Sequence, residues 1–361
     1  MTDKERNEMD RLPKNAMRED LWKISQFFKE NYTGEGRYGT TDLFNWKAFE
    51  NPTGRGFIKF IEIDDEVAFT TSITPKTLWL NNKKISSAEI GDTYKSPKHY
   101  RKDLFSIAAN AARQQAEDQG IKHIYGLPNS KAFAGWLKRG NFLKQSSIHI
   151  RALSLPLDAR NKLQKLIGWH GAEILVGPYR ILARIFLKMK SPNIADKANY
   201  TIEECDVLPQ DWSEFWTAAA EKYQFIFDRD ETSFNWRYIN HFDKYTFLTV
   251  RHNGTLVGYT VHKNIPTDLG YSLVLADYLF LPEHETALNL SLDRIFQGSF
   301  ATSTRAISIW CEKSSPYYDI FCSRGFKDVS ETPVIIYSND IINEVSQIAN
   351  AHFTIGDSDN V

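Results

Sequence analysis

The residues best suited to chemistry lie in one basic turn between a predicted strand and a predicted helix. The turn SPKHYRKD leads into a helix that we expect to begin at Asp103, and it carries Lys98, His99, Arg101 and Lys102. The first N–H groups of a helix have no partner within it and lie at the positive end of the helix dipole. Such a turn favours an anion, and a pyrophosphate is the anion we expect here.

The sequence around this turn resembles the GNAT superfamily of acyltransferases. The resemblance is carried by SPKHYRKDLFSIAANAA and then by GIKHIYGLPNSKAFAGWLKRGNF, and it looks closest to two-domain GNAT-like proteins of bacterial surface-polysaccharide clusters. In this superfamily the acyl-CoA pyrophosphate lies on a strand-to-helix turn, so the resemblance implies acetyl-CoA or another acyl-CoA as a substrate. It implies that the acyl-CoA contacts are Thr93, Tyr94, Lys98, His99, Tyr100, Arg101, Lys102, Asp103, Leu104, Phe105 and Trp136.

The turn departs from the superfamily's usual R-x-x-G-x-G/A pattern. Arg101 is followed by Lys-Asp-Leu-Phe, without a glycine and one residue shorter. Glycine lets backbone N–H groups approach phosphate oxygens closely. Asp103 would add a negative charge near the phosphates, although it would also cap the helix well. The alternative interpretation of the turn is therefore a capped helix start with solvated lysines.

The candidate catalytic residues are Asp92 and Asn129. In the superfamily an Asn at the exit of the second strand and a Tyr seven residues later line the pantetheine, and the Tyr acts as general acid; here Asn129 fits, but Trp136 replaces the Tyr. An indole gives up no proton at neutral pH, so the reaction would depend on proximity and on backbone donors facing the oxyanion. Asp92 could take a proton from an incoming ammonium, or could bond neighbouring backbone at a strand end.

The second half of the chain repeats the first. FNWK at 44–47 returns as FNWR at 234–237, and further on a constant offset of 185 relates Asp92 to Asp277, Pro97 to Pro282, Ile124 to Ile309 and Gly140 to Gly325. The element order is the same in both copies. A solenoid would need shorter and more numerous repeats, so we infer a tandem duplication.

The basic turn survives in the first copy alone. At the offset of 185, Lys98 and Tyr100 become Glu283 and Glu285. Two carboxylates would repel a pyrophosphate, so we expect CoA to bind the first copy and not the second. The second copy then has no chemistry for Asp277 to serve, which favours a structural role for that residue.

The predicted fold class is α/β, with a mixed sheet: two tandem GNAT (acyl-CoA N-acyltransferase) folds joined by a helical linker. We expect domains at 16–152 and 200–345, with the linker at 153–199. Apolar spacing predicts helices at 19–30, 42–50 and 103–119, the last one ended by Gly120. Four strands are expected between 57 and 92, separated by turns at Asp64-Asp65, Pro75 and Asn81-Asn82.

The linker contains an amphipathic segment, Tyr179–Lys190, with an apolar stripe beside a basic one. Such a helix could contact an anionic membrane surface weakly, or could connect the domains with its basic face in water. Glu173, Pro178 and the regular charges exclude a spanning helix. The tail from Asn350 is predicted to be disordered.

Composition narrows the class of protein further. The net charge of −1 over 361 residues gives no broad basic surface, so no nucleic-acid partner is expected. Cys205, Cys311 and Cys322 lack metal-ligand spacing, so we predict free thiols in a reducing compartment and no metal site. The charged N-terminus has no apolar signal segment, which predicts a cytoplasmic location.

The functional expectation is an N-acyltransferase that moves an acyl group, other than an aminoacyl group, from CoA to an amine. The resemblance points to an amino sugar, or its nucleotide-linked precursor, in polysaccharide biosynthesis. Two alternatives stay open. One is a Fem-type transferase using charged transfer RNA, which the near-neutral charge counts against. The other is a non-catalytic GNAT scaffold that serves as a binding or assembly module.

Overall fold

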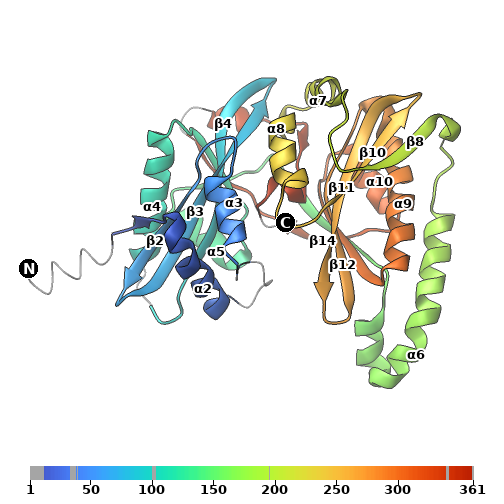
Figure 1. Ribbon diagram of the computed structural model, residues 1–361, viewed down its shortest axis with the longest axis horizontal. Helices are drawn as coiled ribbons and strands as arrows, with labels where there is room; N and C mark the ends of the chain where they lie inside the picture. Colours follow the sequence, from blue (N-terminus) through green and yellow to red (C-terminus); the bar gives the residue numbers. More distant parts are fainter. Residues whose placement is uncertain are drawn as a thin grey trace, which may run out of the picture. The chain divides into compact units, whose positions relative to one another are not determined.

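The computed structural model describes residues 12–32, 38, 40–99, 103–194, 196–338 and 341–359. The chain forms two compact units. The N-terminal unit runs to residue 148 and includes 240–242 and 332–348, and the C-terminal unit contains 149–239, 243–331 and the segment from 349. Each unit is built on a mixed sheet with helices against it (Figure 1).

The sheet of the N-terminal unit has the strand order β1-β2-β3-β4-β5-β15-β6. Strands β1 to β4 are antiparallel neighbours, β5 runs parallel to β4, and β15 runs antiparallel to both β5 and β6. The two-residue turns Asp64-Asp65 and Asn81-Asn82 have positive φ throughout, as tight hairpins require. The strands are β1 Lys14–Asn15, β2 Phe57–Ile63, β3 Glu66–Leu80, β4 Lys83–Lys95, β5 His123–Gly126, β6 Leu143–Lys144 and β15 Ile335–Ser338.

The helices of this unit form where apolar residues recur at helical spacing. They are η1 Arg18–Asp20, α2 Leu21–Asn31, α3 Asp42–Phe49, α4 Asp103–Asp118, α5 Ser130–Arg139 and α11 Ile342–Val345. Helix α4 packs on β2 and β3 through a face of small residues that includes Ala108, Ala112 and Ala116. It ends as predicted at Gly120, which has a φ of 78° and follows the last helical turn.

The sheet of the C-terminal unit has the order β14-β7-β13-β12-β11-β10-β8. Its β12 and β13 are parallel, as β4 and β5 are in the other unit. The strands of this sheet are β7 Ile150–Pro156, β8 Tyr200–Cys205, β10 Thr246–His252, β11 Thr255–Thr267, β12 Gly270–Phe280, β13 Thr304–Glu312 and β14 Lys327–Thr332. Two further short strands of the unit, β9 Phe225–Phe227 and β16 Ala351–His352, are not part of this sheet and pair in parallel with each other.

The helices of the C-terminal unit are a long α6 and several shorter helices around the sheet. They are α6 Arg160–Met189, η3 Lys197–Asn199, α7 Trp212–Ala220, α8 Glu231–Phe234, the π-helix η4 Asn235–Ile239, η5 Pro282–Ala287, α9 Leu288–Ala301, α10 Pro316–Ser323 and η6 Ile355–Asp357. Helix α6 contacts α9 and is kinked at Gly168, where φ is 73°.

The division into units differs from the predicted domain boundaries. Strand β7 lies at the start of the expected linker but pairs with β13, and α6 also belongs to the C-terminal unit. Strand β15 was expected in the second domain, yet it pairs with β5 in the sheet of the N-terminal unit. Strand pairing between segments about two hundred residues apart leaves no local sequence pattern. The sequence therefore could not predict that β15 belongs to the sheet of the N-terminal unit.

Two local predictions are wrong. Pro75 does not end a strand: β3 continues through it, because β2 pairs with β3 only as far as Ile73 and the missing N–H breaks no bond of that ladder. The segment from Asn350 is not disordered within the described residues, because 351–359 are buried in the C-terminal unit. Asp357 and Thr354 form a capping box that fixes the short helix η6 there.

His123 on β5 should make the N-terminal unit sensitive to acid. Both ring nitrogens are buried without a hydrogen-bond partner among the described residues, and burial lowers the pKa of His123 from 6.5 to about 4. The unfolded chain takes up a proton near the ordinary pKa and the folded chain only near pH 4, so the free energy of unfolding falls as the pH drops through this window. In urea unfolding, we expect the free energy of unfolding of His123→Leu to fall less steeply as the pH drops, by up to about 1.4 kcal/mol per pH unit.

The control is His170→Leu, which makes the same change at an exposed histidine of α6. This variant should show the same pH dependence of the free energy of unfolding as the unaltered chain. An unchanged pH dependence in His123→Leu would contradict the prediction.

Candidate functional site

In the N-terminal unit, β4 extends beyond its parallel partner and leaves an edge beside the start of α4. Strand β5 pairs with β4 from Ser87 to Ile90, whereas β4 continues to Lys95 along β3. The residues Gly91–Lys95, which we call the β4 edge, are all half-buried. Strand β5 pairs with no residue of this edge. The carbonyls of Gly91 and Asp92 accept hydrogen bonds from threonine hydroxyls, Thr71 and Thr93 for Gly91 and Thr70 for Asp92.

A bulge at Asp92 bends β4 where this edge begins. The register with β3 shifts between Thr70 and Ser72, and Asp92 has a φ of 47°. Its carboxylate Oδ2 accepts from Lys47 Nζ and from Ser72 Oγ, both at 2.6 Å. The Asp92 and Lys47 side chains are only 1% and 3% exposed. A bulge leaves one residue out of the ladder and re-aims its neighbours, and here a buried ion pair holds it.

The C-terminal unit repeats this arrangement at Asp277. A register shift at Val261/His262 marks a bulge in the pairing of β11 with β12, and Asp277 bonds Arg229 at 2.9 Å and 3.1 Å. The hydroxyls of Tyr238 and Tyr259 also donate to Asp277. Burial lowers the pKa of Arg229, but Asp277 and Asp357 outweigh it and raise that pKa well above its usual value. This geometry agrees with the structural role expected for Asp277.

The geometry of Asp92 favours the same role over that of a general base. Its Oδ2 is held by Lys47 and Ser72, while its Oδ1 is buried and has no hydrogen-bond partner within the described part of the chain. A carboxylate in this state is not open to solvent or to an incoming amine. Lys47 was not identified from the sequence; the available signal was a lysine between Trp46 and Ala48 in a short helix.

Several residues expected to contact acyl-CoA have side chains in the core instead. Trp136 packs edge-on against Phe105 and Phe142 at ring distances of 4.8 Å and 4.9 Å. Leu104 is fully buried in the same cluster. The hydroxyl of Tyr94 donates to the carbonyl of Asn31, and its ring packs on α2.

Asn129 also has a local task. Its side-chain oxygen accepts from the N–H groups of Lys131 and Ala132, which makes it the N-cap of α5. Both of these hydrogen bonds go to the amide oxygen of Asn129. The N-cap signal, an Asn before a helical stretch, is readable from the sequence.

The remaining predicted residues lie at or near the turn before α4. Lys98 forms an exposed ion pair with Glu66 at 2.7 Å, and His99 has a buried Nε2 without a partner among the described residues. Thr93 lies on the β4 edge, and its hydroxyl oxygen is 2.8 Å from that of Thr71. Asp103 is the first residue of α4 and is exposed. Tyr100, Arg101 and Lys102 lie outside the described residues.

The corresponding edge of β12 is filled by the C-terminal unit's own side chains. Leu275–Phe280 are buried, and the hydroxyl of Tyr317 bonds both the N–H and the carbonyl of Phe280, at 2.8 Å and 3.1 Å. Tyr278 reaches across to β13, where its hydroxyl donates to the carbonyl of Trp310. At the offset of 185, Tyr278 corresponds to Thr93 and Tyr317 to Ala132. The first copy therefore lacks both of the side chains that occupy the second.

The C-terminal segment closes the same region of that unit. The ring of His352 lies 5.5 Å from that of Tyr278, and Thr354 Oγ1 bonds Asp277 Oδ1 at 3.2 Å. Asp357 pairs with Arg229 at 3.0 Å. No local pattern predicts this packing, because the segment is short and far from its partners along the chain.

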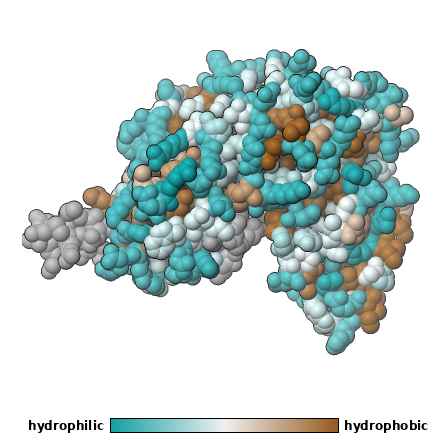
Figure 2. Space-filling view, viewed as in Figure 1, coloured by the Kyte–Doolittle hydropathy of each residue, from teal (hydrophilic) through white to brown (hydrophobic). Residues whose placement is uncertain are grey.

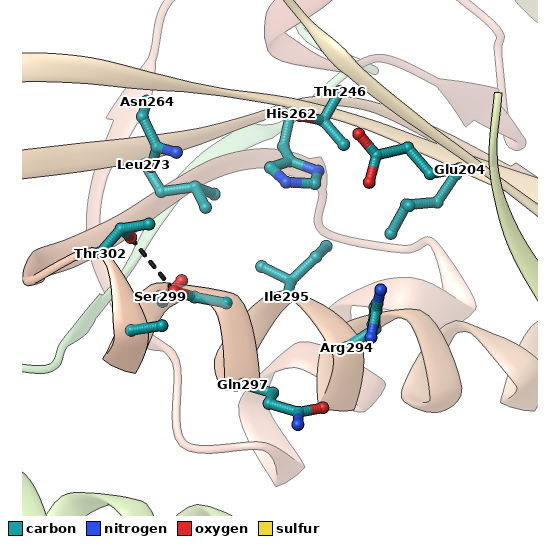
Figure 3. A pocket seen from close by; sticks show the side chains of 13 residues that line it. Glu204, Thr246, His262, Asn264, Leu273, Arg294, Ile295, Gln297, Ser299 and Thr302 are labelled. Carbon is teal, nitrogen blue, oxygen red and sulfur yellow. Dashed lines mark hydrogen bonds between the residues drawn. The ribbon is translucent and has the colours of Figure 1, made fainter. Parts of the chain in front are cut away.

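A separate pocket of about 410 Å³ lies in the C-terminal unit, between one face of the sheet and α9. Figure 3 shows His262, Glu204 and Thr246 on the strand side, with Arg294 and Gln297 on the helix side. Burial lowers the pKa of His262 to about 4, so its ring is neutral at pH 7. None of the predicted site residues lines this pocket.

No group of three or more His, Cys, Asp or Glu side chains gathers as a metal site in the described ranges. Cys205, Cys311 and Cys322 are free, as predicted. Burial raises the pKa of the Cys311 thiol to about 12, so it is an unreactive core residue rather than a nucleophile.

Comparison with solved structures identifies the fold. A tandem GNAT protein from the clavulanic acid biosynthesis pathway matches with a TM-score of 0.60 and 12% identity, over 91% of this chain and 97% of that one. A protein of unknown function from Enterococcus faecalis V583, described as a probable N-acyltransferase, gives 0.59 and 11% over 90% and 72%. N-myristoyltransferase of Saccharomyces cerevisiae with bound myristoyl-CoA gives 0.60 and 13% over 89% and 76%.

The chain therefore has the tandem GNAT fold, and the predicted α/β fold class is confirmed. No protein-family model matches the sequence, and no curated protein matches it.

The buried pair Lys47–Asp92 should carry much of the stability of the N-terminal unit. Lys47→Met would leave the Asp92 carboxylate buried without its cation, which costs about 3–5 kcal/mol in comparable sites. We expect urea unfolding to show a loss of this size. Lys98→Met makes the same change in an exposed ion pair, and we expect it to have no measurable effect.

The opposite pattern would contradict this assignment. If Lys47→Met unfolds at the same urea concentration as the unaltered chain, the ion pair does not hold the bulge, and the role of Asp92 as a base regains support.

Proposed function

We propose that the protein is an acyl-CoA-dependent N-acyltransferase whose acyl-CoA binds the N-terminal unit along the β4 edge, with its pyrophosphate at the start of α4. One observation carries the proposal: the β4 edge is half-buried and unpaired by β5, while the equivalent edge in the second copy is filled by Tyr278 and Tyr317. The tandem GNAT fold and the basic turn at 98–102 support it.

The chemistry would depend on placement more than on an acid or base. The amine nitrogen attacks the thioester carbonyl, a C–N bond forms, the C–S bond breaks, and the CoA thiolate leaves and is protonated. The bulge at Asp92 leaves a backbone N–H out of the ladder, where it could donate to the oxyanion. Lys47 and Ser72 hold this bulge in place, and Asp92 acts through that geometry rather than by taking the proton.

The finer assignments stay predictions. An amino sugar or its nucleotide-linked precursor as acceptor, acetyl-CoA as donor, a role in polysaccharide biosynthesis and a cytoplasmic location all rest on the sequence alone. The assignment of acyl-CoA contacts to Tyr100, Arg101 and Lys102 likewise rests on the sequence.

Calorimetric titration with acetyl-CoA and with CoA tests the proposal. The unaltered chain should bind both saturably, at micromolar to low millimolar concentration. Thr93→Tyr gives the first copy the tyrosine of the second, so it should block the β4 edge and weaken binding more than about tenfold, or 1.4 kcal/mol. Arg101→Glu should weaken binding by removing a cation from the predicted pyrophosphate site.

Two control variants match these changes. Thr201→Tyr makes the same substitution at an exposed position of β8, and Glu283→Lys changes an exposed charge in the turn of the second copy. Both should bind as the unaltered chain does. If the unaltered chain binds neither compound, the acyl-CoA proposal is wrong, and the non-catalytic binding module becomes the leading function.

A further inference from the structure

Helix α6 exposes an unusual number of large apolar side chains. Ten of the nineteen exposed large apolar residues in the described parts of the chain belong to this one helix of 30 residues. They include Leu166 and Met189, each 79% exposed, and Ile174, 75% exposed, together with Trp169, Ile181 and Leu182. Figure 2 shows brown, apolar residues on the part of the surface that α6 forms in Figure 1. A concentration of this kind marks a surface that has a partner.

The helix is firmly seated on the C-terminal unit, so this exposure is not a sign of loose packing. Ala172, Val176 and Leu187 are buried, and Leu187 belongs to the core of that unit. The guanidinium of Arg180 donates to the carbonyls of Thr304 at 2.8 Å and Phe300 at 3.1 Å. The inner face of α6 is thus occupied, and its other faces carry the exposed apolar residues.

Cations accompany this apolar surface. Residues 160–190 contain seven Lys and Arg residues and one carboxylate, Glu173, which pairs with Arg160 at 3.2 Å. The exposed cations Lys165, Arg184 and Lys188 therefore lie among apolar side chains without a carboxylate of α6 to neutralise them. Lys190 also lies over the ring of Phe186. This composition is typical of helices that lie in the interface of an anionic bilayer.

The same charges make a second copy of this chain a poor partner. A symmetric dimer packs the same surface of both copies together, so two positively charged surfaces would be brought into contact. Anionic lipid headgroups supply the missing negative charge. None of the helices in the described parts of the chain combines the length and the hydropathy that a membrane span requires.

We propose that α6 docks the protein on an anionic lipid bilayer, with the side chains of Ile174, Ile181 and Ile185 entering the interface and Arg184 and Lys188 contacting lipid headgroups. This inference goes beyond the acyltransferase assignment and does not depend on it. It makes the amphipathic segment at 179–190 a membrane contact rather than a connector with a solvated basic face.

Flotation of the full chain with vesicles tests the docking. The probes are vesicles of phosphatidylcholine alone and vesicles with about 30% phosphatidylglycerol, a fraction that gives a surface charge like that of anionic membranes. The protein should float with the anionic vesicles, less with the neutral ones, and less at high salt. Ile181→Glu/Ile185→Glu places two charges in the proposed buried face, and Arg184→Glu/Lys188→Glu reverses the cations. Both should lower the bound fraction more than about tenfold.

The matched control is Val207→Glu/Val329→Glu, which adds two carboxylates at exposed apolar positions of the same unit outside α6. It should bind vesicles nearly as the unaltered chain does. All of the substituted positions are exposed, so circular dichroism and urea unfolding should match the unaltered chain.

Three outcomes would overturn the proposal. One is no flotation with anionic vesicles, and another is flotation that the α6 variants leave unchanged. The third is a dimer in light scattering that Ile181→Glu/Ile185→Glu dissociates while vesicle binding is absent, which would identify a second copy as the partner. Acyl-CoA binding measured separately by calorimetry is unaffected by each of these results.

Discussion

Each of the two units contains a buried carboxylate at a strand bulge. In each copy an Asp on the first strand of the parallel pair, Asp92 on β4 and Asp277 on β12, has an almost fully buried side chain that is bonded to a cation. A lone buried charge is costly, so the cation and the hydroxyl donors around it are part of the fold. In the first copy the bulge lies where the pairing of β4 with β5 has ended and β4 continues along β3 alone.

Both copies contain the buried pair of an Asp and a cation, but the strand beyond the Asp has different surroundings in each. In the first, Lys47 and Ser72 hold Asp92, and the strand beyond it stays half-buried. In the second, Arg229 holds Asp277, and Tyr278, Tyr317 and the segment 351–359 fill the space beyond it. The acidic residues Glu283 and Glu285 replace the basic turn there, and burial, together with Glu283, raises the pKa of Glu285. The two copies therefore differ in how far the strand beyond the bulge is buried.

Local patterns predicted the elements well because their causes are local. Helical spacing located α2, α3 and α4, paired Asp or Asn residues located the hairpin turns, and Gly120 located the end of α4. The strand-to-helix turn and the Asp at its entrance were also visible. What the sequence could not show depends on distant contacts: β15 completing the sheet beside β5, and the C-terminal segment packing beside Asp277.

Among the site residues, too, the features that depend on distant contacts could not be predicted from the sequence. Asp92 was identifiable as polar at a strand end, but its role depends on Lys47, a residue 45 positions away in the sequence. Trp136 and Tyr94 were assigned to the ligand because of their positions in a superfamily pattern, whereas packing uses them in the core. Aromatic residues at such positions are consistent with either role until their neighbours are known. The contacts of Asp92, Trp136 and Tyr94 therefore could not be predicted from their positions in the pattern.

Hydrogen exchange measured by mass spectrometry, with and without acetyl-CoA, tests the central claim most directly. The account predicts that acetyl-CoA slows exchange in peptides covering 91–95 and the start of α4 at Asp103, and leaves peptides covering 275–280 unchanged. Protection confined to 275–280, or no protection in either copy at saturating acetyl-CoA, would contradict the claim that the first copy holds the ligand and the second is closed by its own side chains.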